Sequence, residues 1–473
     1  MNDHTVNLIL FYKMNNFFKF DFLCRRRNST SKQRQNIAVT LAQKAQNFQQ
    51  KMLSVLLRIY CFIQSQMKSN QKEMEGNGFK FMKEPFPHVL IQSQRLLPEV
   101  FLKDIQYLKD LGLGNLVERW LGNCLGCTNT TDPAWSQLKK IFLPVFNVSE
   151  RDYDSLMLEW DGEIWKLMQQ SQATEKPVSI EKVVADLPLT FVLRRIFGAS
   201  FLNQYKETFQ MLEENSAFLV LKINKPDKIS KWWFYRFLPT QTNAVLKNFQ
   251  LNWKMILETA ALSQDVEREG IYQQLVQNYQ NSQGVTFKMF SETLAEIIFT
   301  NKDIAVPTAA WLLTHYSLYP SVTDPSLFIE ESARLAPVLP MSFAKRTTKD
   351  RVLDNVKIPK GTIVFMDFIA LGKSADWNMS DLETFRPERF NGIKKEVFVN
   401  RFGYGGRKCA GSRIATTLLK QMLEHLQKNW LLRPSQPTKL DSIKKDPLHP
   451  LNMPLFEVWI EKLGPSGDCV DCL

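Results

Sequence analysis

Apolar residues recur at helical spacing through most of the chain after residue 75, and this pattern predicts a mainly α-helical fold. The longest apolar helical run covers residues 288–318, and a shorter helix is expected over 96–110. Two short strands are expected at 78–82 and 88–92, on either side of a proline-containing stretch. The predicted fold class is therefore mainly α with a minor β-sheet component, and no internal repeat or linker divides the helical part.

The N-terminal part differs from the rest in its charge. Residues 1–75 contain 12 Lys and Arg against 4 Asp and Glu, a net charge of +8 out of +12 for the whole chain. Such a segment favours an anionic lipid surface or is simply solvated. No apolar stretch in it reaches the roughly 20 residues that cross a bilayer, although 52–63 is typical of an amphipathic surface helix. We expect three parts: a basic, atypical segment at 1–75, the helical domain at 76–463 and a flexible tail at 464–473.

Composition narrows the class of protein. Hydrophobic residues make up 44% of the 473 residues and aromatic residues 12%, which is ample for one large core. Seven cysteines at irregular spacing do not resemble a secreted disulfide framework, so a reducing compartment is expected. The pairs Cys124/Cys127 and Cys469/Cys472 offer four zinc ligands in principle, but the second pair lies in the tail, which disfavours one shared site. No motif for nucleic acid, dinucleotide or serine nucleophile chemistry is present.

The strongest chemical signal is the pattern F-x-x-G-x-R-x-C-x-G, which runs from Phe402 to Gly411 just before a helical segment. A thiolate of Cys409 at a helix N-terminus is stabilised by the helix dipole and by backbone N–H groups. Phe402 can cover the sulfur, while Gly405 and Gly411 let the backbone pass close to a flat ligand. Arg407 can bind a carboxylate. The alternative is a buried cysteine in a glycine-rich turn.

This pattern resembles the haem-binding loop of the cytochrome P-450 family, and the resemblance covers about residues 75–463. It implies haem b (iron protoporphyrin IX) with Cys409 as the axial thiolate and metal ligand. It also implies that Arg407 pairs with a haem propionate. The chain resembles eukaryotic members, and the T-N-x-D pattern in the long helix and the divergent N-terminus are similar to fungal members of secondary-metabolite pathways.

Further residues resemble the family's propionate-binding groups. Asp132 and Pro133 predict the start of a helix, on which Trp135 and Lys139 lie one turn apart. The resemblance implies that this pair contacts a haem propionate, and that Arg346 is another propionate-binding residue. The alternative for the helix is a core tryptophan beside a solvated lysine.

The long helix carries the residues that the resemblance places beside dioxygen. Asp303 matches the family's acid, but Ile304 stands where a proton-relaying threonine is usual. Pro307 lacks the N–H that would bond to the carbonyl of Asp303, so a kink and a free acceptor are expected there. A water at that acceptor can carry protons, and Thr308, one turn beyond Ile304, is a candidate helper. The alternative for Pro307 is a packing kink without chemistry.

Three charged residues resemble the family's buried triad near the haem. Glu331 and Arg334 form E-x-x-R on a helix, and Arg389 lies in the sequence P-E-R-F. The triad's implied role is to lock the haem pocket. The interval from Asp303 to Glu331 is only 28 positions. Family members normally carry extra helices there, so either this protein has lost them or an exon is missing from the sequence.

The resemblance implies a monooxygenase that inserts one atom of dioxygen into an apolar small molecule, with NADPH-derived electrons from a flavoprotein reductase. The basic flank of the cysteine loop can steer an acidic reductase. The expected location is the cytosolic face of the endoplasmic reticulum membrane. Two alternatives stay open: a haem-thiolate isomerase or dehydratase that needs no reductase, and a non-catalytic or incomplete haem-binding relic.

Overall fold

The structure is a computed structural model, and the residues that it describes belong to one compact unit. That unit begins at Lys72, and a first unit covers Met1–Gln71. The expectations for the basic N-terminal segment and for the C-terminal tail lie outside the described residues. None of the described helices is both long enough and apolar enough to cross a membrane. The described residues are 74–76, 79–82, 88–102, 107–109, 115–184, 186–224, 236–392, 401–446 and 451–464.

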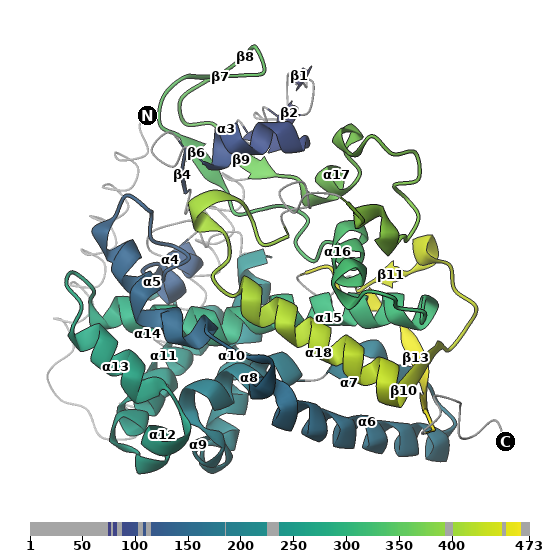
Figure 1. Ribbon diagram of the computed structural model, residues 1–473. Helices are drawn as coiled ribbons and strands as arrows, with labels where there is room; N and C mark the ends of the chain where they lie inside the picture. The colour runs from purple at the N-terminus through teal and green to yellow at the C-terminus, as the bar shows by residue number, and fades with distance from the viewer. Residues whose placement is uncertain are drawn as a thin grey trace, which may run out of the picture. The chain divides into compact units, whose positions relative to one another are not determined.

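Helices dominate the unit, which confirms the predicted fold class (Figure 1). The longer helices are α5 (Pro133–Phe146), α6 (Asp154–Thr174), α10 (Lys206–Asn224), α11 (Gln241–Leu262), α15 (Asn301–Leu318) and α18 (Ser412–Asn429). The shorter ones are α3 (Leu97–Phe101), α4 (Asn115–Leu121), α7 (Ile180–Val184), α8 (Leu187–Phe197), α9 (Ala199–Gln204), α12 (Gln264–Glu269), α13 (Tyr272–Gln280), α14 (Phe287–Ala295), α16 (Pro325–Leu335) and α17 (Phe368–Gly372).

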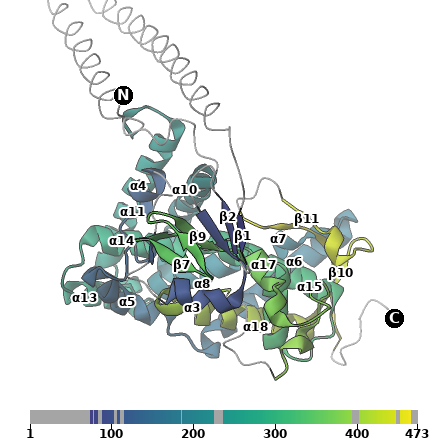
Figure 2. The same ribbon diagram turned by 90° about the horizontal axis from the view of Figure 1, so that it is seen from above.

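The main sheet joins strands from the beginning and the middle of the described chain, purple and green in Figure 2. Its order is β1-β2-β3-β9-β6-β4, and the β3–β9 pair alone is parallel among its described pairs. Its strands are β1 (Met74–Gly76), β2 (Phe79–Met82), β3 (His88–Ile91), β4 (Tyr107–Lys109), β6 (Lys345–Thr347) and β9 (Ile363–Met366). Smaller sheets contain β5 (Val178–Ser179), β7 (Arg351–Leu353), β8 (Val356–Ile358), β10 (Trp430–Pro434), β11 (Lys444–Lys445), β12 (Pro454–Leu455) and β13 (Glu457–Lys462).

The two strands expected near the start of the sheet are β2 and β3, but the helix expected over 96–110 is wrong in its second half. Helix α3 ends at Phe101, and Tyr107–Lys109 form strand β4 instead. The reason is long-range: β4 pairs in antiparallel register with β6, far along the chain. Backbone pairing and packing against a neighbouring strand override the local helical pattern.

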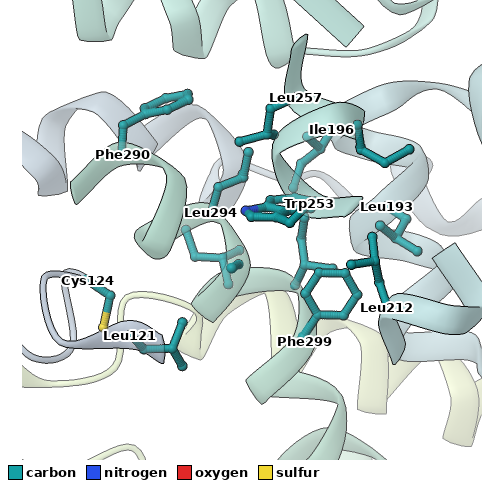
Figure 3. Packing of buried hydrophobic residues seen from close by; sticks show 14 of the residues in the cluster. Leu121, Cys124, Leu193, Ile196, Leu212, Trp253, Leu257, Phe290, Leu294 and Phe299 are labelled. Atoms are coloured by element: carbon teal, nitrogen blue, oxygen red, sulfur yellow. The ribbon is translucent and has the colours of Figure 1, made fainter. Parts of the chain in front are cut away.

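Two large apolar clusters fill the helical part of the unit. One gathers residues of α4, α5, α8, α10, α11, α13 and α14, and Figure 3 shows its centre, where Trp253 lies against Phe299. Their ring centroids are 5.5 Å apart and nearly perpendicular, a favourable edge-to-face arrangement. The other cluster joins α6, α15 and α18 to strands β10 and β13. Most buried apolar residues of α15 belong to this second cluster, whereas Ile297, Ile298 and Phe299 of the segment just before it belong to the first.

The apolar run predicted over 288–318 is a nearly continuous helix with one irregular segment. Helix α14 passes into a π-helical segment at Glu296–Thr300, and α15 follows at once. The Thr300 hydroxyl donates to the carbonyl of Glu296, 2.7 Å away. Pro307 lies inside α15 as expected. Wide π-helical turns often mark functional sites, because they re-aim the side chains on either side.

The short interval before Glu331 forms a capped connection between α15 and α16. The side chain of Asp324 caps α16 by accepting the N–H groups of Ser326 and Leu327. The carbonyl of Val322 accepts from Nε2 of Gln427 in α18 at 2.9 Å. The sequence as it stands therefore joins the two helices with a hydrogen-bonded loop.

Candidate haem-binding site

The Cys409 loop is a tight, hydrogen-bonded turn that leads into α18. The N–H of Cys409 donates to the carbonyl of Phe402 at 2.7 Å, and the N–H of Ser412 donates to the carbonyl of Cys409. Gly405 has φ of 73°, and a Cβ there would lie 2.5 Å from the carbonyl of Phe101. Glycine is thus required at 405 by the close packing against α3, a reason that the sequence did not reveal.

The sulfur of Cys409 has the surroundings that an axial ligand needs. Burial is the largest influence on the Cys409 pKa and raises it; the N–H of Gly411 and the charge of Lys408 oppose that effect, while Glu296 adds to it. The residue is nevertheless exposed. Both observations hold if protein surrounds the sulfur on most sides and leaves one side uncovered. An added Cβ at Gly411 would lie 3.7 Å from this sulfur, so the glycine keeps the space beside it free. The uncovered side of the sulfur, the N–H of Gly411 and the charge of Lys408 fit a thiolate that binds a metal, whereas burial favours the neutral thiol.

Phe402 and Arg401 lie together at the start of the loop. The guanidinium carbon of Arg401 is 4.8 Å from the centroid of the Phe402 ring, and its Nη2 is 3.0 Å from Glu330 in α16. Burial lowers the pKa of Arg401 from its ordinary value, and Glu330 counteracts part of that effect. Arg401 is therefore engaged inside the protein and contributes less to a basic surface than the sequence suggested.

Arg407 and the expected propionate-binding pair of α5 lie together. The guanidinium of Arg407 is 5.7 Å from the Trp135 ring centroid, and Lys139 Nζ is 5.2 Å from the same ring. Arg407 also donates to the carbonyls of Thr128 at 2.5 Å and Gly126 at 3.0 Å. In Figure 1 the segment that leads into α18 lies beside α4 and α5, in agreement with these contacts. Two cations and an indole N–H are thus gathered close to the Cys409 loop, a donor set that suits carboxylates.

Arg346 lies elsewhere, in strand β6 of the main sheet. Its side chain is exposed, and Nη1 donates to the carbonyl of Gly361 at 2.7 Å. The structure gives this residue a clear role in joining β6 to the turn before β9. Its assignment to a propionate remains a prediction from the resemblance.

The oxygen-side residues occupy the first turns of α15. The hydroxyl of Thr308 donates to the carbonyl of Ile304 at 2.6 Å, so its proton is directed along the helix. Lys302, directly before Asp303, forms ion pairs with Glu213 of α10 and with Asp186. Position 304 carries isoleucine and therefore no hydroxyl.

Glu331, Arg334 and Arg389 form a fully buried charge cluster. Glu331 accepts from Nε of Arg334 at 2.7 Å and from Nε of Arg389 at 2.8 Å, and all three side chains are 0% exposed. It also accepts the backbone N–H of Arg386. Other N–H groups of the same two arginines donate to the carbonyls of Gly372, Asp381, Leu382 and Thr384. A buried charge that is paired and hydrogen-bonded in this way is stable, and one that loses its partner is not.

Sequence reasoning missed two groups near the site. Asp381 joins the charge cluster through a 3.2 Å contact with Arg389. Glu296, in the π-helical segment, accepts the N–H of Gly126 at 2.9 Å and lies close enough to raise the Cys409 pKa. A carboxylate within the largely apolar helical run is the sequence signal that could have identified Glu296.

Comparison with known proteins identifies the class that this fold and site define. A family model described as Cytochrome P450 matches residues 23–325 and 326–455, so the chain belongs to the cytochrome P450 family. The two matched segments meet at the start of α16, at the end of the interval that the sequence analysis found short. The resemblance expected from the Cys409 loop is therefore confirmed.

Several relatives support the same class. The cytochrome P450 monooxygenase asaD of Aspergillus flavus is 24% identical over 408 residues, 79% of this chain and 78% of that protein. The cytochrome P450 monooxygenase PUL2 of Kluyveromyces lactis is 23% identical, over 72% of this chain and 75% of that protein. A solved structure of a cytochrome P450DA mutant heme domain has a TM-score of 0.67 at 14% identity, over 83% of this chain and 91% of that chain. The chain is an oxidoreductase of the monooxygenase type, and its family binds haem through a thiolate.

Proposed function

We propose that this protein holds haem b through Cys409 and inserts one oxygen atom from dioxygen into an apolar small molecule. Its electrons come from NADPH through a flavoprotein reductase. The observation that carries this proposal is the Cys409 loop at the start of α18, with Arg407, Trp135 and Lys139 gathered beside it. When bound, haem supplies the binding and cleavage of dioxygen, which electron density from the thiolate favours.

The residues of the loop bind and orient that group. Cys409 would bind the iron through its thiolate, and the N–H of Gly411 stabilises the negative charge of that thiolate. Arg407 and Lys139 neutralise propionates, with Trp135 between them as a further donor. Phe402 limits the access of water to the sulfur. Together these residues retain haem; because burial raises the Cys409 pKa, ionisation of the cysteine depends on the bound metal.

Protons reach the site through the helix rather than through residue 304. Pro307 has no N–H, so the carbonyl of Asp303 lacks its usual helical donor and can hold a water. The proposed role of the Asp303 carboxyl is to exchange protons with that water. Thr308 contributes little, since its hydroxyl donates to the carbonyl of Ile304.

We further propose that the protein works at the cytosolic face of the endoplasmic reticulum membrane. Exposed Lys408 is the cation of the loop that remains available to an acidic partner, because Arg401 and Arg407 are engaged within the protein. The buried cluster around Glu331 keeps the surrounding backbone rigid and takes no part in the chemistry.

The test is the carbon-monoxide difference spectrum of the dithionite-reduced recombinant protein, followed by turnover assays with NADPH and reductase. We expect a strongly red-shifted Soret band that is lost in Cys409→Ser, and substrate oxidation only when NADPH and reductase are both present. A band without the red shift in the parent protein would contradict ligation by Cys409.

A second candidate is a haem-thiolate isomerase or dehydratase, and the hydrophobic side chain of Ile304 favours it. Such an enzyme needs no delivery of protons to dioxygen. The same assay separates the two, because turnover of a peroxide or another activated substrate without NADPH and reductase is expected of this class alone. Failure to incorporate haem at all would instead favour an incomplete relic, which the short interval before Glu331 suggested.

A further inference from the structure

The turn Gly122–Thr128 after α4 is held from one side by the oxygen-side helix. Three side chains of α14 and the π-helical segment accept its backbone N–H groups. The pairs are Glu292 with Asn123 at 2.7 Å, Thr293 with Leu125 at 3.0 Å and Glu296 with Gly126 at 2.9 Å. Each pair joins residues about 170 positions apart, so these contacts belong to the tertiary structure and not to a local motif.

The Cys409 loop holds the same turn from the other side. Arg407 donates to the carbonyls of Gly126, Thr128 and, at 3.4 Å, Leu125. Gly126 is the residue that both sides share: its N–H binds Glu296 and its carbonyl binds Arg407. The turn therefore connects the π-helical segment to the loop that carries the cysteine.

The turn itself is firmly placed, so it can transmit a constraint. Cys124 and Cys127 are buried, and Figure 3 shows Cys124 beside Leu121 at the margin of the apolar cluster. Burial raises the pKa of Cys124 well above its ordinary value, and a hydrogen bond with Cys127 adds to that effect. The Cys124 thiol stays protonated, and both cysteines act as packing groups. No three described His, Cys, Asp or Glu side chains are grouped to hold a metal ion.

The contact between Glu296 and Gly126 leaves no room for a side chain. A Cβ at residue 126 would lie 1.7 Å from Oε1 of Glu296, far inside any van der Waals contact. The backbone thus approaches the carboxylate as closely as only glycine permits. Because the contact depends on glycine at one end and a long acceptor at the other, it can be broken from either end.

We propose that Glu296 is a positioning residue, which fixes Gly126 and, through Gly126 and Arg407, the loop that carries Cys409. The contacts stand on their own, but the relevance of the loop to catalysis rests on the proposed function. A carboxylate also acts at a distance through its charge, whereas positioning depends on the accepted hydrogen bond. Glutamine at 296 keeps an acceptor of the same length and removes the charge, so it separates the two effects.

The experiment is hydrogen exchange measured by mass spectrometry on the full chain, read in peptides that cover 122–128 and 401–411. Glu296→Ala is expected to speed exchange about tenfold in both peptides, a change typical of one lost hydrogen bond to a buried donor. Gly126→Ala is expected to do the same from the other end. Glu296→Gln should stay within about twofold of the parent protein.

Glu269→Ala is the matched control. Glu269 also accepts a backbone N–H from a neighbouring helix, that of Ser200 at 2.8 Å, but it lies in α12 and its hydrogen bonds are to α9. This variant should leave both peptides unchanged. If Glu296→Ala speeds exchange at 122–128 but not at 401–411, the turn does not transmit the constraint and the proposal is wrong. It is equally wrong if Glu296→Gln behaves like Glu296→Ala, because charge would then be the cause.

The haem-loaded protein gives an independent spectroscopic readout. Loosening the Cys409 loop should convert part of the red-shifted carbon-monoxide band into the unshifted form in Glu296→Ala and Gly126→Ala, and leave Glu296→Gln unaltered. A parent protein without any red-shifted band would defeat the proposed function. The exchange experiment would still decide the positioning role, since it needs no haem.

Discussion

The buried cluster around Glu331 and the contact around Glu296 both join distant segments next to the Cys409 loop, but with different partners. Glu331 binds two guanidinium groups with all three side chains 0% exposed. Glu296 is only partly buried and binds a neutral backbone N–H. Opposite charges in a water-free setting form an all-or-none unit, because each charge that loses its partner is left uncompensated. When a neutral N–H loses its acceptor, only one hydrogen bond is lost and no charge is left unpaired. The first region should control whether the fold forms, and the second should control how one loop is placed.

Glu331→Ala is expected to have the largest effect on stability and tests the difference between the two regions. It leaves Arg334 and Arg389 buried without their carboxylate, and we expect a loss of roughly 3–5 kcal/mol in the free energy of unfolding. Urea unfolding followed by circular dichroism measures it. Glu383→Ala is the control, since Glu383 pairs with Lys373 at the surface and should cost at most about 1 kcal/mol. Similar losses in the two variants would contradict the distinction between the regions.

A third buried contact joins the neutral side chains of His315 in α15 and Ser332 in α16. It makes the stability of the protein depend on pH. His315 is 0% exposed, its Nδ1 lies 2.8 Å from the hydroxyl of Ser332, and burial lowers its pKa to about 3. Unfolding restores a pKa near 6.5, so the unfolded state binds more protons between these values. The contribution of His315 is therefore present above about pH 6.5 and is lost as the pH falls toward 3, by about 1.4 kcal/mol per unit.

His315→Phe tests this dependence. An aromatic ring stays in place beside Trp311 and Phe385, whose centroids lie 5.6 Å and 4.9 Å from that of His315, while the titrating group is removed. Urea unfolding at pH 7 and pH 5 should show a smaller drop in stability for the variant than for the parent chain. Equal drops would mean that His315 is not the group responsible.

The Glu296 contact should have a smaller effect on stability than either of these. Glu296→Ala removes one acceptor from a backbone N–H, which costs about 1–2 kcal/mol in the free energy of unfolding. Glu296→Gln should recover most of that loss, whereas Glu331→Gln should not recover the loss at 331, because an amide cannot neutralise two guanidinium groups. The pair of glutamine variants, measured under the same urea conditions, is the sharpest comparison of the two regions. Equal recovery at both positions would remove the difference between them.

The features that the sequence predicted correctly are those that depend on residues close together in the chain. The helical period gave the fold class, and the fixed spacing of the Cys409 loop identified the family, because both signals lie within short segments. Strand β4 was missed since it exists through pairing with β6. The contact of Glu296 with Gly126 was missed for the same reason: it joins two parts of the chain 170 positions apart, and Glu296 is the first residue of a π-helical segment. The roles assigned to the site residues, Arg346 and Asp303 among them, stay predictions, because contacts within the chain do not show what each side chain binds.

The smallest expected effect concerns Thr308 and the missing hydroxyl at Ile304. The Thr308 hydroxyl donates to the carbonyl of Ile304 in its own helix and not to another element. Thr308→Val should therefore change the free energy of unfolding by about 0.5 kcal/mol or less. It should also leave the ratio of product formed to NADPH consumed nearly unaltered. Ile304→Thr restores a hydroxyl one turn earlier and should raise that ratio if proton delivery limits the reaction. A large fall in the ratio for Thr308→Val would instead show that protons pass through Thr308. The proposed role of a water at the Asp303 carbonyl would then be wrong.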